Sequence, residues 1–159
     1  LGWEFTANRE EFIGVIGQVG WEATVAAVKA LAKGKDNVPA DAVYGLTKRI
    51  MNYYIGTIQE KFGEKKIRVN AILPMATDTG LTQDFGMMAG SVEIFAEYGT
   101  GLAHRLARPL EMAAPMVFLN SDMASFIGGC LLNADSSTKI MMERDVEPNL
   151  LYTQLLGKR

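Results

Sequence analysis

The chain has 159 residues, of which 48% are hydrophobic and 21% are charged, and its formal net charge is −2. This length fits one domain, and the composition is that of a folded protein rather than a disordered one. No apolar run approaches the roughly 20 residues of a membrane span, and no basic excess favours nucleic acid as a partner. The single cysteine, Cys130, is typical of a reducing compartment, so we expect a cytoplasmic location.

The first third of the chain is predicted to be helical. Residues 4–33 carry apolar side chains between charged ones, and glycines near Gly17–Gly20 predict a break into two short helices. The cluster of turn residues at 34–39 ends the second helix. A long amphipathic helix is then predicted over 41–62, with Asp41 as its cap and apolar residues at spacings of three and four.

The rest of the chain alternates strands and helices, as in an α/β protein. Residues 67–74 and 126–134 are β-branched or apolar runs and are predicted as buried strands with both faces covered. Between them, 75–101 is predicted as a loop with one or two short helices, and 110–119 as a helix. A connection of this length between two strands indicates a parallel pair. Two strands do not make a stable sheet, so the pattern requires more strands than this chain supplies.

One pair of side chains has catalytic potential. Tyr44 and Lys48 are four residues apart near the start of the long predicted helix and therefore lie on one face. An ammonium group beside a phenol favours the phenolate and lowers the phenol pKa, so such a pair can move a proton at a carbonyl or alcohol oxygen. Taken alone, the pair is equally consistent with an exposed Tyr–Lys contact of no catalytic importance, on an unrelated helical scaffold.

The segments that follow make a family resemblance specific. In order along the chain, they are Tyr44-Gly45-Leu46-Thr47-Lys48, Arg68-Val69-Asn70-Ala71-Ile72-Leu73-Pro74, Met75-Ala76-Thr77-Asp78-Thr79, Arg105-Leu106-Ala107-Arg108-Pro109-Leu110-Glu111, Ser125-Phe126-Ile127-Gly128-Gly129 and Leu132-Asn133-Ala134-Asp135. From about Asp41 to Ser137 the chain resembles the C-terminal half of the short-chain dehydrogenase/reductase family. The resemblance implies the C-terminal part of a Rossmann-type doubly wound parallel sheet that binds NAD or NADP.

The resemblance also implies roles for individual residues. Tyr44 corresponds to the catalytic acid/base, and Lys48 to the residue that binds the nicotinamide ribose and lowers the Tyr44 pKa. The stretch from Pro74 to Thr79 matches the family's Pro-Gly-x-x-x-Thr segment, whose backbone after the proline, here at Met75, and whose threonine hold the nicotinamide carboxamide. Thr79 is the first candidate for that threonine and Thr77 the second. No metal site is expected.

Two positions depart from the family pattern. Met75 stands where the family usually has glycine, which puts the backbone approach to the nicotinamide in question. Asp135-Ser136-Ser137 replaces Asp-Gly-Gly, a change that bears on turn geometry more than on catalysis. Residues 75–101 correspond to the substrate-binding loop, in which Phe85 and Met87-Met88 are expected either to form an adaptable apolar lid or to fill the core.

The N-terminal part of the chain suggests a branch of the family. A helical insertion at 4–33 before the tyrosine, together with Ala76-Thr77-Asp78-Thr79, resembles the bacterial 3α-hydroxysteroid dehydrogenase/carbonyl reductase branch. Residues 1–159 are thus expected to be the C-terminal portion of one dinucleotide-binding catalytic domain. The family's glycine-rich loop, its catalytic serine and the residue that selects NAD or NADP are expected upstream of Leu1.

The expected function is the interconversion of a carbonyl and a secondary alcohol on a hydrophobic small molecule such as a steroid. The intact protein is expected to be a homodimer or homotetramer that associates through the 41–62 helix or, if the insertion covers that helix, through the 110–119 helix and the last strand. The alternative is a catalytically inactive fragment, or a binding or assembly module, without a cofactor loop. The 159 residues alone are expected to bind no cofactor and to be inactive.

Overall fold

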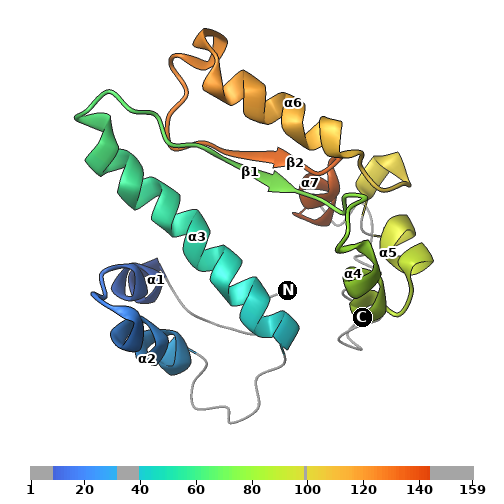
Figure 1. Cartoon of the computed structure of the whole chain (residues 1–159), viewed down its shortest axis with the longest axis horizontal. Helices are drawn as coiled ribbons and strands as arrows, with labels where there is room; N and C mark the ends of the chain where they lie inside the picture. The colour runs from blue at the N-terminus through green and yellow to red at the C-terminus, as the bar shows by residue number, and fades with distance from the viewer. Residues whose placement is uncertain (1–8, 32–39, 99, 144–159) are drawn as a thin grey trace. The chain divides into compact units, whose positions relative to one another are not determined.

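The computed structural model describes residues 9–31, 40–98 and 100–143, which belong to two compact units, Leu1–Val69 and Asn70–Arg159 (Figure 1). The described part of the first unit is helical: α1 (Arg9–Ile16), α2 (Trp21–Leu31) and α3 (Ala40–Gly63). The predicted break between the first two helices is confirmed, and Gly20 within it has a φ of 91° that favours glycine. The predicted helical residues 4–8 and 32–33 and the predicted turn at 34–39 lie outside the described residues.

The long helix α3 differs from its prediction at both ends. It begins at Ala40, so Asp41 lies in the first turn and is not the N-terminal cap, and it ends at Gly63 instead of residue 62. After the helix, the N–H groups of Lys65 and Ile67 donate to the carbonyl of Phe62 at 3.0 and 3.1 Å. The chain thus turns away immediately beyond the last helical residue.

An apolar core holds α3 in the first unit. Leu46 on α3 is only 1% exposed and is buried together with Val15 of α1 and Leu31 of α2. Ile50 and Tyr53, one and two turns further along the same side of α3, pack against this cluster. The helices α1 and α2 therefore cover the Leu46–Ile50–Tyr53 side of α3.

The second unit contains a parallel strand pair. β1 (Ala71–Pro74) pairs with β2 (Leu131–Ala134) in a register that places Ala71 beside Leu131 and Pro74 beside Ala134. The parallel α/β prediction is confirmed. The alternative of an unrelated helical scaffold is excluded, because both predicted strand segments contain a true strand.

Both strands are shorter than the sequence predicts. Residues 67–70 are not in β1, because the side chain of Gln59 on α3 accepts a hydrogen bond from the Val69 N–H at 2.6 Å instead. Residues 126–130 are not in β2, since Gly129 adopts a φ of 71°, outside the extended region. The prediction of a buried strand at Phe126 is wrong, for this side chain is fully exposed.

The second unit also contains helices between the two strands and after them. α6 (Pro109–Asn120) lies along both strands (Figure 1) and is followed by the short helix η2 (Asp122–Ala124). α4 (Thr82–Ala89) and α5 (Val92–Tyr98) form a helix pair inside the predicted 75–101 loop, which ends in η1 (Gly101–Ala103). α7 (Thr138–Glu143) follows β2. Most strand residues are half-buried and none is buried, so the prediction of two covered faces fails within the described residues.

No described helix combines the length and the apolar character that crossing a membrane requires.

Candidate active site

The Tyr44–Lys48 pair forms as the helical spacing predicts. Lys48 Nζ lies 5.2 Å from the centroid of the Tyr44 ring, within the range of a cation–π contact. Both side chains are exposed, Tyr44 to 41% of its surface. Leu46 lies two residues after Tyr44, about 200° around the helix, and is buried. The core therefore holds one side of α3 and leaves the Tyr44–Lys48 side open.

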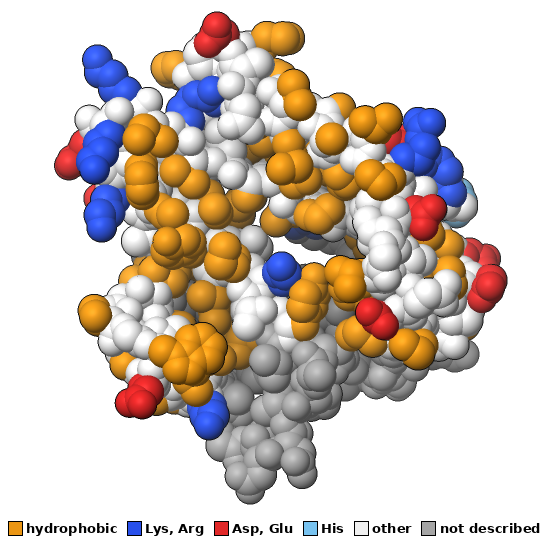
Figure 2. All heavy atoms as spheres, in the orientation of Figure 1, with side chains coloured by type: hydrophobic (Ala, Val, Ile, Leu, Met, Phe, Trp, Pro, Cys, Tyr) orange, Lys and Arg blue, Asp and Glu red, His pale blue; other side chains and the backbone are white. Residues whose placement is uncertain are grey.

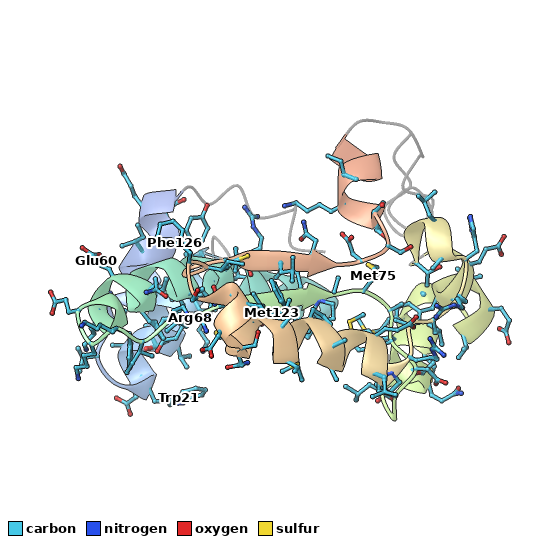
Figure 3. All side chains as sticks on the ribbon, turned by 90° about the horizontal axis from the view of Figure 1, so that it is seen from above. Trp21, Glu60, Arg68, Met75, Met123 and Phe126 are labelled. Atoms are coloured by element: carbon cyan, nitrogen blue, oxygen red, sulfur yellow. The ribbon has the colours of Figure 1, made fainter. Side chains whose placement is uncertain are left out.

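The segment after β1 continues the strand ladder by one residue. The Met75 N–H donates to the carbonyl of Ala134, the last residue of β2, at 3.1 Å. Met75 does not have a positive φ. A methionine in place of the family's glycine is therefore compatible with an ordinary backbone here. Figure 3 shows Met75 at the end of the sheet opposite to Phe126.

A second, isolated parallel bridge supports Thr77. The Asp78 N–H donates to the Ala107 carbonyl at 2.9 Å, and the Ala107 N–H donates to the Ala76 carbonyl at 2.9 Å, on either side of Thr77. Because backbone groups alternate in direction along an extended chain, the N–H and C=O of Thr77 point away from Ala107. Thr77 thus presents one donor and one acceptor on the opposite edge of this segment.

The two candidate threonines differ in their hydroxyl groups. The Thr77 hydroxyl donates to the Met75 carbonyl at 2.7 Å, so its proton is used inside the segment. The Thr79 hydroxyl is exposed and accepts a hydrogen bond from the Leu81 N–H at 3.3 Å. A hydroxyl that accepts a bond keeps its own proton to donate. This difference favours Thr79 over Thr77 as a donor to a ligand, which is the same ranking that the sequence suggests.

The turn after β2 is built around Asp135. Its carboxylate accepts hydrogen bonds from the N–H groups of Ser137 and Lys139 at 3.1 and 3.0 Å. Ser136 and Ser137 have φ values of 48° and 71°, in the left-handed region where the family's glycines meet no steric cost. The replacement of the family's two glycines by Ser136 and Ser137 therefore affects the backbone geometry of this turn.

An ion pair fixes the entry to α6. Arg105 forms two hydrogen bonds with the Glu111 carboxylate, at 2.8 and 2.7 Å, and the Arg108 N–H donates to the same carboxylate at 2.8 Å. The hydrogen bonds from Arg105, and after them those from Arg108, hold the pKa of Glu111 well below its usual range. The Glu111 hydrogen bonds and charge raise the pKa of Arg105.

A cavity of about 480 Å³ lies at the carboxyl ends of β1 and β2. Apolar and polar side chains line it together, and among them are Met75, Met112, Ile140, Arg105, Glu111, Asp135 and Ser137. Sequence reasoning named only Met75 of these as a site residue. Open α/β sheets bind ligands at the carboxyl ends of their parallel strands. From this rule, the residues that follow the predicted strands could also have been identified as candidates.

The predicted substrate loop, residues 75–101, exposes apolar side chains. Met87 and Met88 of α4 are exposed, so the alternative in which they fill the core is wrong. Phe85 of α4 instead stacks on Phe95 of α5, with ring centroids 5.7 Å apart, and joins the two helices. Met87 and Met88 are left to face outward from the pair.

The predicted site residues thus form two groups. Tyr44 and Lys48 come together on α3 in the first unit. Pro74, Met75, Thr77 and Thr79 lie at the end of β1 and in the segment that follows it, in the second unit. Thr82, Ala107 and Ala134, which sequence reasoning did not name, hold the second group. Each group is defined within its own unit.

Known proteins are similar to this chain in sequence. A family model described as Enoyl-(Acyl carrier protein) reductase matches residues 22–136. The uncharacterized oxidoreductase YmfI of Bacillus subtilis is 32% identical over 102 residues, which cover 64% of this chain and 40% of that protein. Trihydroxynaphthalene reductase of Colletotrichum orbiculare is 31% identical over 114 residues, which cover 67% of this chain and 39% of that protein. The chain therefore spans about 40% of the length of these curated relatives.

A solved structure agrees with the sequence relatives. A short chain dehydrogenase family protein from Francisella tularensis superposes with a TM-score of 0.55 at 25% identity, covering 67% of this chain and 47% of that chain. This likeness supports the fold that the parallel strand pair indicates. On these grounds, the chain belongs to the short-chain dehydrogenase/reductase family.

Proposed function

We propose that this chain is the C-terminal portion of the catalytic domain of an NAD(P)-dependent oxidoreductase that interconverts a carbonyl and a secondary alcohol. The observation that carries the proposal is the exposed Tyr44–Lys48 pair on α3, with Lys48 Nζ 5.2 Å from the tyrosine ring. The single Cys130 favours the cytoplasm as the location.

In this proposal Tyr44 handles the proton. Its phenol donates a proton to the substrate oxygen during reduction and accepts one during oxidation. The Lys48 ammonium stabilises the phenolate that forms when the proton leaves, and it donates a hydrogen bond to the nicotinamide ribose. A bound nicotinamide would supply or accept the hydride at the substrate carbon.

The segment Pro74–Thr79 is proposed to hold the nicotinamide carboxamide. A carboxamide offers one acceptor and two donor hydrogens, and the segment offers matching groups. The Thr79 hydroxyl and the Thr77 N–H are donors. The Thr77 carbonyl already accepts a bond from the Thr82 hydroxyl at 3.4 Å and has a second lone pair with which to accept another. Pro74 and Met75 set the position of this edge by continuing the pairing with β2.

The substrate is proposed to be hydrophobic, a steroid or another apolar carbonyl compound. The α4–α5 pair presents Met87 and Met88 on its surface, and flexible thioether side chains adapt to apolar ligands of varied shape. The resemblance to the 3α-hydroxysteroid dehydrogenase/carbonyl reductase branch, which rests on the helical insertion, supports the same substrate class.

The critical test replaces one hydroxyl. In the intact protein, Tyr44→Phe should lower turnover by roughly 10²–10⁴-fold, the usual contribution of a positioned acid/base, while cofactor affinity is largely kept. Tyr54→Phe is the matched control, because Tyr54 lies on the same helix and is also 41% exposed. Unchanged turnover in Tyr44→Phe would refute the assignment.

A second candidate function is a module that binds or assembles without chemistry. The observation that favours it is the sheet, which has two strands among the described residues, fewer than independent stability requires. Absence of a glycine-rich loop and a catalytic serine upstream in the full-length protein would favour this module over the oxidoreductase. Titration of the isolated 159-residue chain with NADH and NADPH tests a separate point, whether this portion binds a cofactor by itself. We expect no binding and no turnover from the chain alone, and measurable affinity would contradict that expectation.

The intact protein is proposed to be a homodimer or homotetramer. α1 and α2 cover the Leu46 side of α3, whereas α6 and η2 expose apolar side chains (Figure 2): Leu110, Met116, Val117 and Met123. The α6 surface is therefore the proposed interface. Val117→Glu should reduce the mass measured by light scattering to that of the monomer, and an unchanged mass would rule this surface out.

A further inference from the structure

Thr82 makes hydrogen bonds that set it apart from the other buried polar residues. The buried polar side chains of the described residues are three threonines, Thr82, Thr100 and Thr138. Thr100 and Thr138 each use the hydroxyl to donate to a nearby carbonyl, that of Ala96 at 2.7 Å and that of Asp135 at 2.6 Å. The Thr82 hydroxyl instead contacts the backbone at two positions of the segment after β1.

These contacts reach both ends of the Thr77–Thr79 stretch. The Thr82 hydroxyl oxygen accepts a hydrogen bond from the Thr79 N–H at 2.9 Å, and the hydroxyl donates to the Thr77 carbonyl at 3.4 Å. The Thr82 N–H also donates to the Thr79 carbonyl at 3.0 Å. Both backbone groups of Thr79 are thereby paired with one residue, which restricts the rotation of its peptide groups and so the direction of its side chain.

The same residue is the first of α4. The hydroxyl of Thr82 is therefore a direct connection between the 77–79 stretch and the helix pair of the 75–101 loop. On its other side the stretch is fixed by Ala107 through the bridge at Thr77. Without the Thr82 hydroxyl, the Thr79 N–H would lose its partner, whereas the Thr79 carbonyl would keep its bond from the Thr82 N–H and the Thr79 hydroxyl its bond from the Leu81 N–H.

We infer that Thr82 is a positioning residue for the nicotinamide carboxamide, acting through Thr77 and Thr79 and linking their geometry to the substrate loop. This inference rests on the proposed function of those two residues. Thr82 is buried and its hydroxyl is already paired with the Thr77 and Thr79 backbone, so it acts through these groups and does not itself contact the cofactor. Loss of its hydroxyl should therefore weaken cofactor binding and leave the proton transfer at Tyr44 intact.

The test compares Thr82→Val, Thr82→Ser and Thr138→Val in the intact protein. Valine has the shape of threonine without the hydroxyl, and serine keeps the hydroxyl. Thr138→Val removes the hydroxyl of an equally buried threonine outside the 74–79 segment. The measurements are hydrogen exchange at the Thr79 amide without cofactor, the Kd of NADH and of NADPH, and kcat and KM for the cofactor.

We expect Thr82→Val to raise the Kd and the cofactor KM by about five- to tenfold, the effect of one lost hydrogen bond, with kcat changed less than twofold. Exchange at the Thr79 amide should accelerate by at least a similar factor. Thr82→Ser should restore both properties, and Thr138→Val should change neither. Thermal unfolding of the two valine variants shows whether they lose comparable stability.

Each contrary result has a distinct meaning. An unchanged Kd in Thr82→Val, with wild type binding NADH or NADPH, would overturn the inference and leave the proposed function standing. Faster exchange at Thr79 with an unchanged Kd would do the same, because the segment would then be ordered by Thr82 without serving the cofactor. A wild-type protein that binds neither nucleotide would overturn the proposed function and the inference together.

Discussion

The helix that carries Tyr44 and Lys48 is held in place by apolar packing, whereas the segment that carries Thr77 and Thr79 is held by hydrogen bonds. In the first unit, the buried Leu46 fixes the far side of α3, and the Tyr44–Lys48 pair follows from helical geometry. In the second, the segment after β1 depends on polar partners contributed by α4 and by residues well removed in sequence. Packing tolerates small shifts along a helix, while a set of hydrogen bonds fixes individual backbone groups.

The two kinds of support suit the two functions that are proposed for these residues. A tyrosine that moves a proton needs an accessible face and a nearby ammonium group, which two residues of one helix can provide. A segment that binds a planar carboxamide needs donors and acceptors at set positions, which requires a backbone held from several sides. Mutations in each unit, followed by measurement of the free energy of unfolding, show whether the two units respond as these two modes of support require.

The largest effect is expected in the core of the first unit. Leu46→Ala should lower the free energy of unfolding by about 2–5 kcal/mol, because it removes a fully buried side chain and leaves a cavity. Met51→Ala, on the same helix at a position 49% exposed, should cost less than about 0.5 kcal/mol. Urea unfolding of both variants measures the difference, and equal costs would show that packing against Leu46 does not stabilise α3.

A smaller effect of opposite sign is expected in the turn of the second unit. Ser136→Gly and Ser137→Gly should each stabilise the protein by up to about 1 kcal/mol, since both serines have a left-handed backbone that strains a residue with a Cβ. Ser125→Gly is the control, because Ser125 has a φ of −57° and glycine there should destabilise by about 0.5–1 kcal/mol. Thermal unfolding distinguishes the two directions, and destabilisation by glycine at all three positions would contradict the strain argument.

The smallest effect is expected at the exposed ion pair before α6. The pKa of Glu111 is lowered in the folded protein, so its contribution to stability is present above the unfolded pKa, near 4.3. That contribution is lost as the pH falls from there toward the lower folded pKa. Glu111→Gln should therefore lose less stability than wild type between pH 5 and pH 3, with urea midpoints as the measure. Identical pH profiles would mean that the Arg105 contacts do not contribute.

Much of the helical architecture follows from local sequence. The break between α1 and α2, the extent of α3 to within one residue at each end, the helices inside 75–101 and the parallel strand pair were all predictable. The strand lengths were not, because their ends depend on Gln59 and on the left-handed Gly129. Phe126 illustrates the limit, since an apolar residue in an apolar run is exposed here.

The candidate site divides in the same way. By itself, the sequence determined the Tyr44–Lys48 pair, because residues four apart on a helix share a face whatever surrounds them. It also indicated the segment from Pro74 to Thr79, through the resemblance to the family's Pro-Gly-x-x-x-Thr stretch. Only the tertiary structure decided how Thr77 and Thr79 differ and that Thr82, Ala107 and Ala134 support them. The physical reason is that hydrogen bonds between distant segments depend on where the folded backbone places each donor and acceptor, and spacing along the chain does not encode that position.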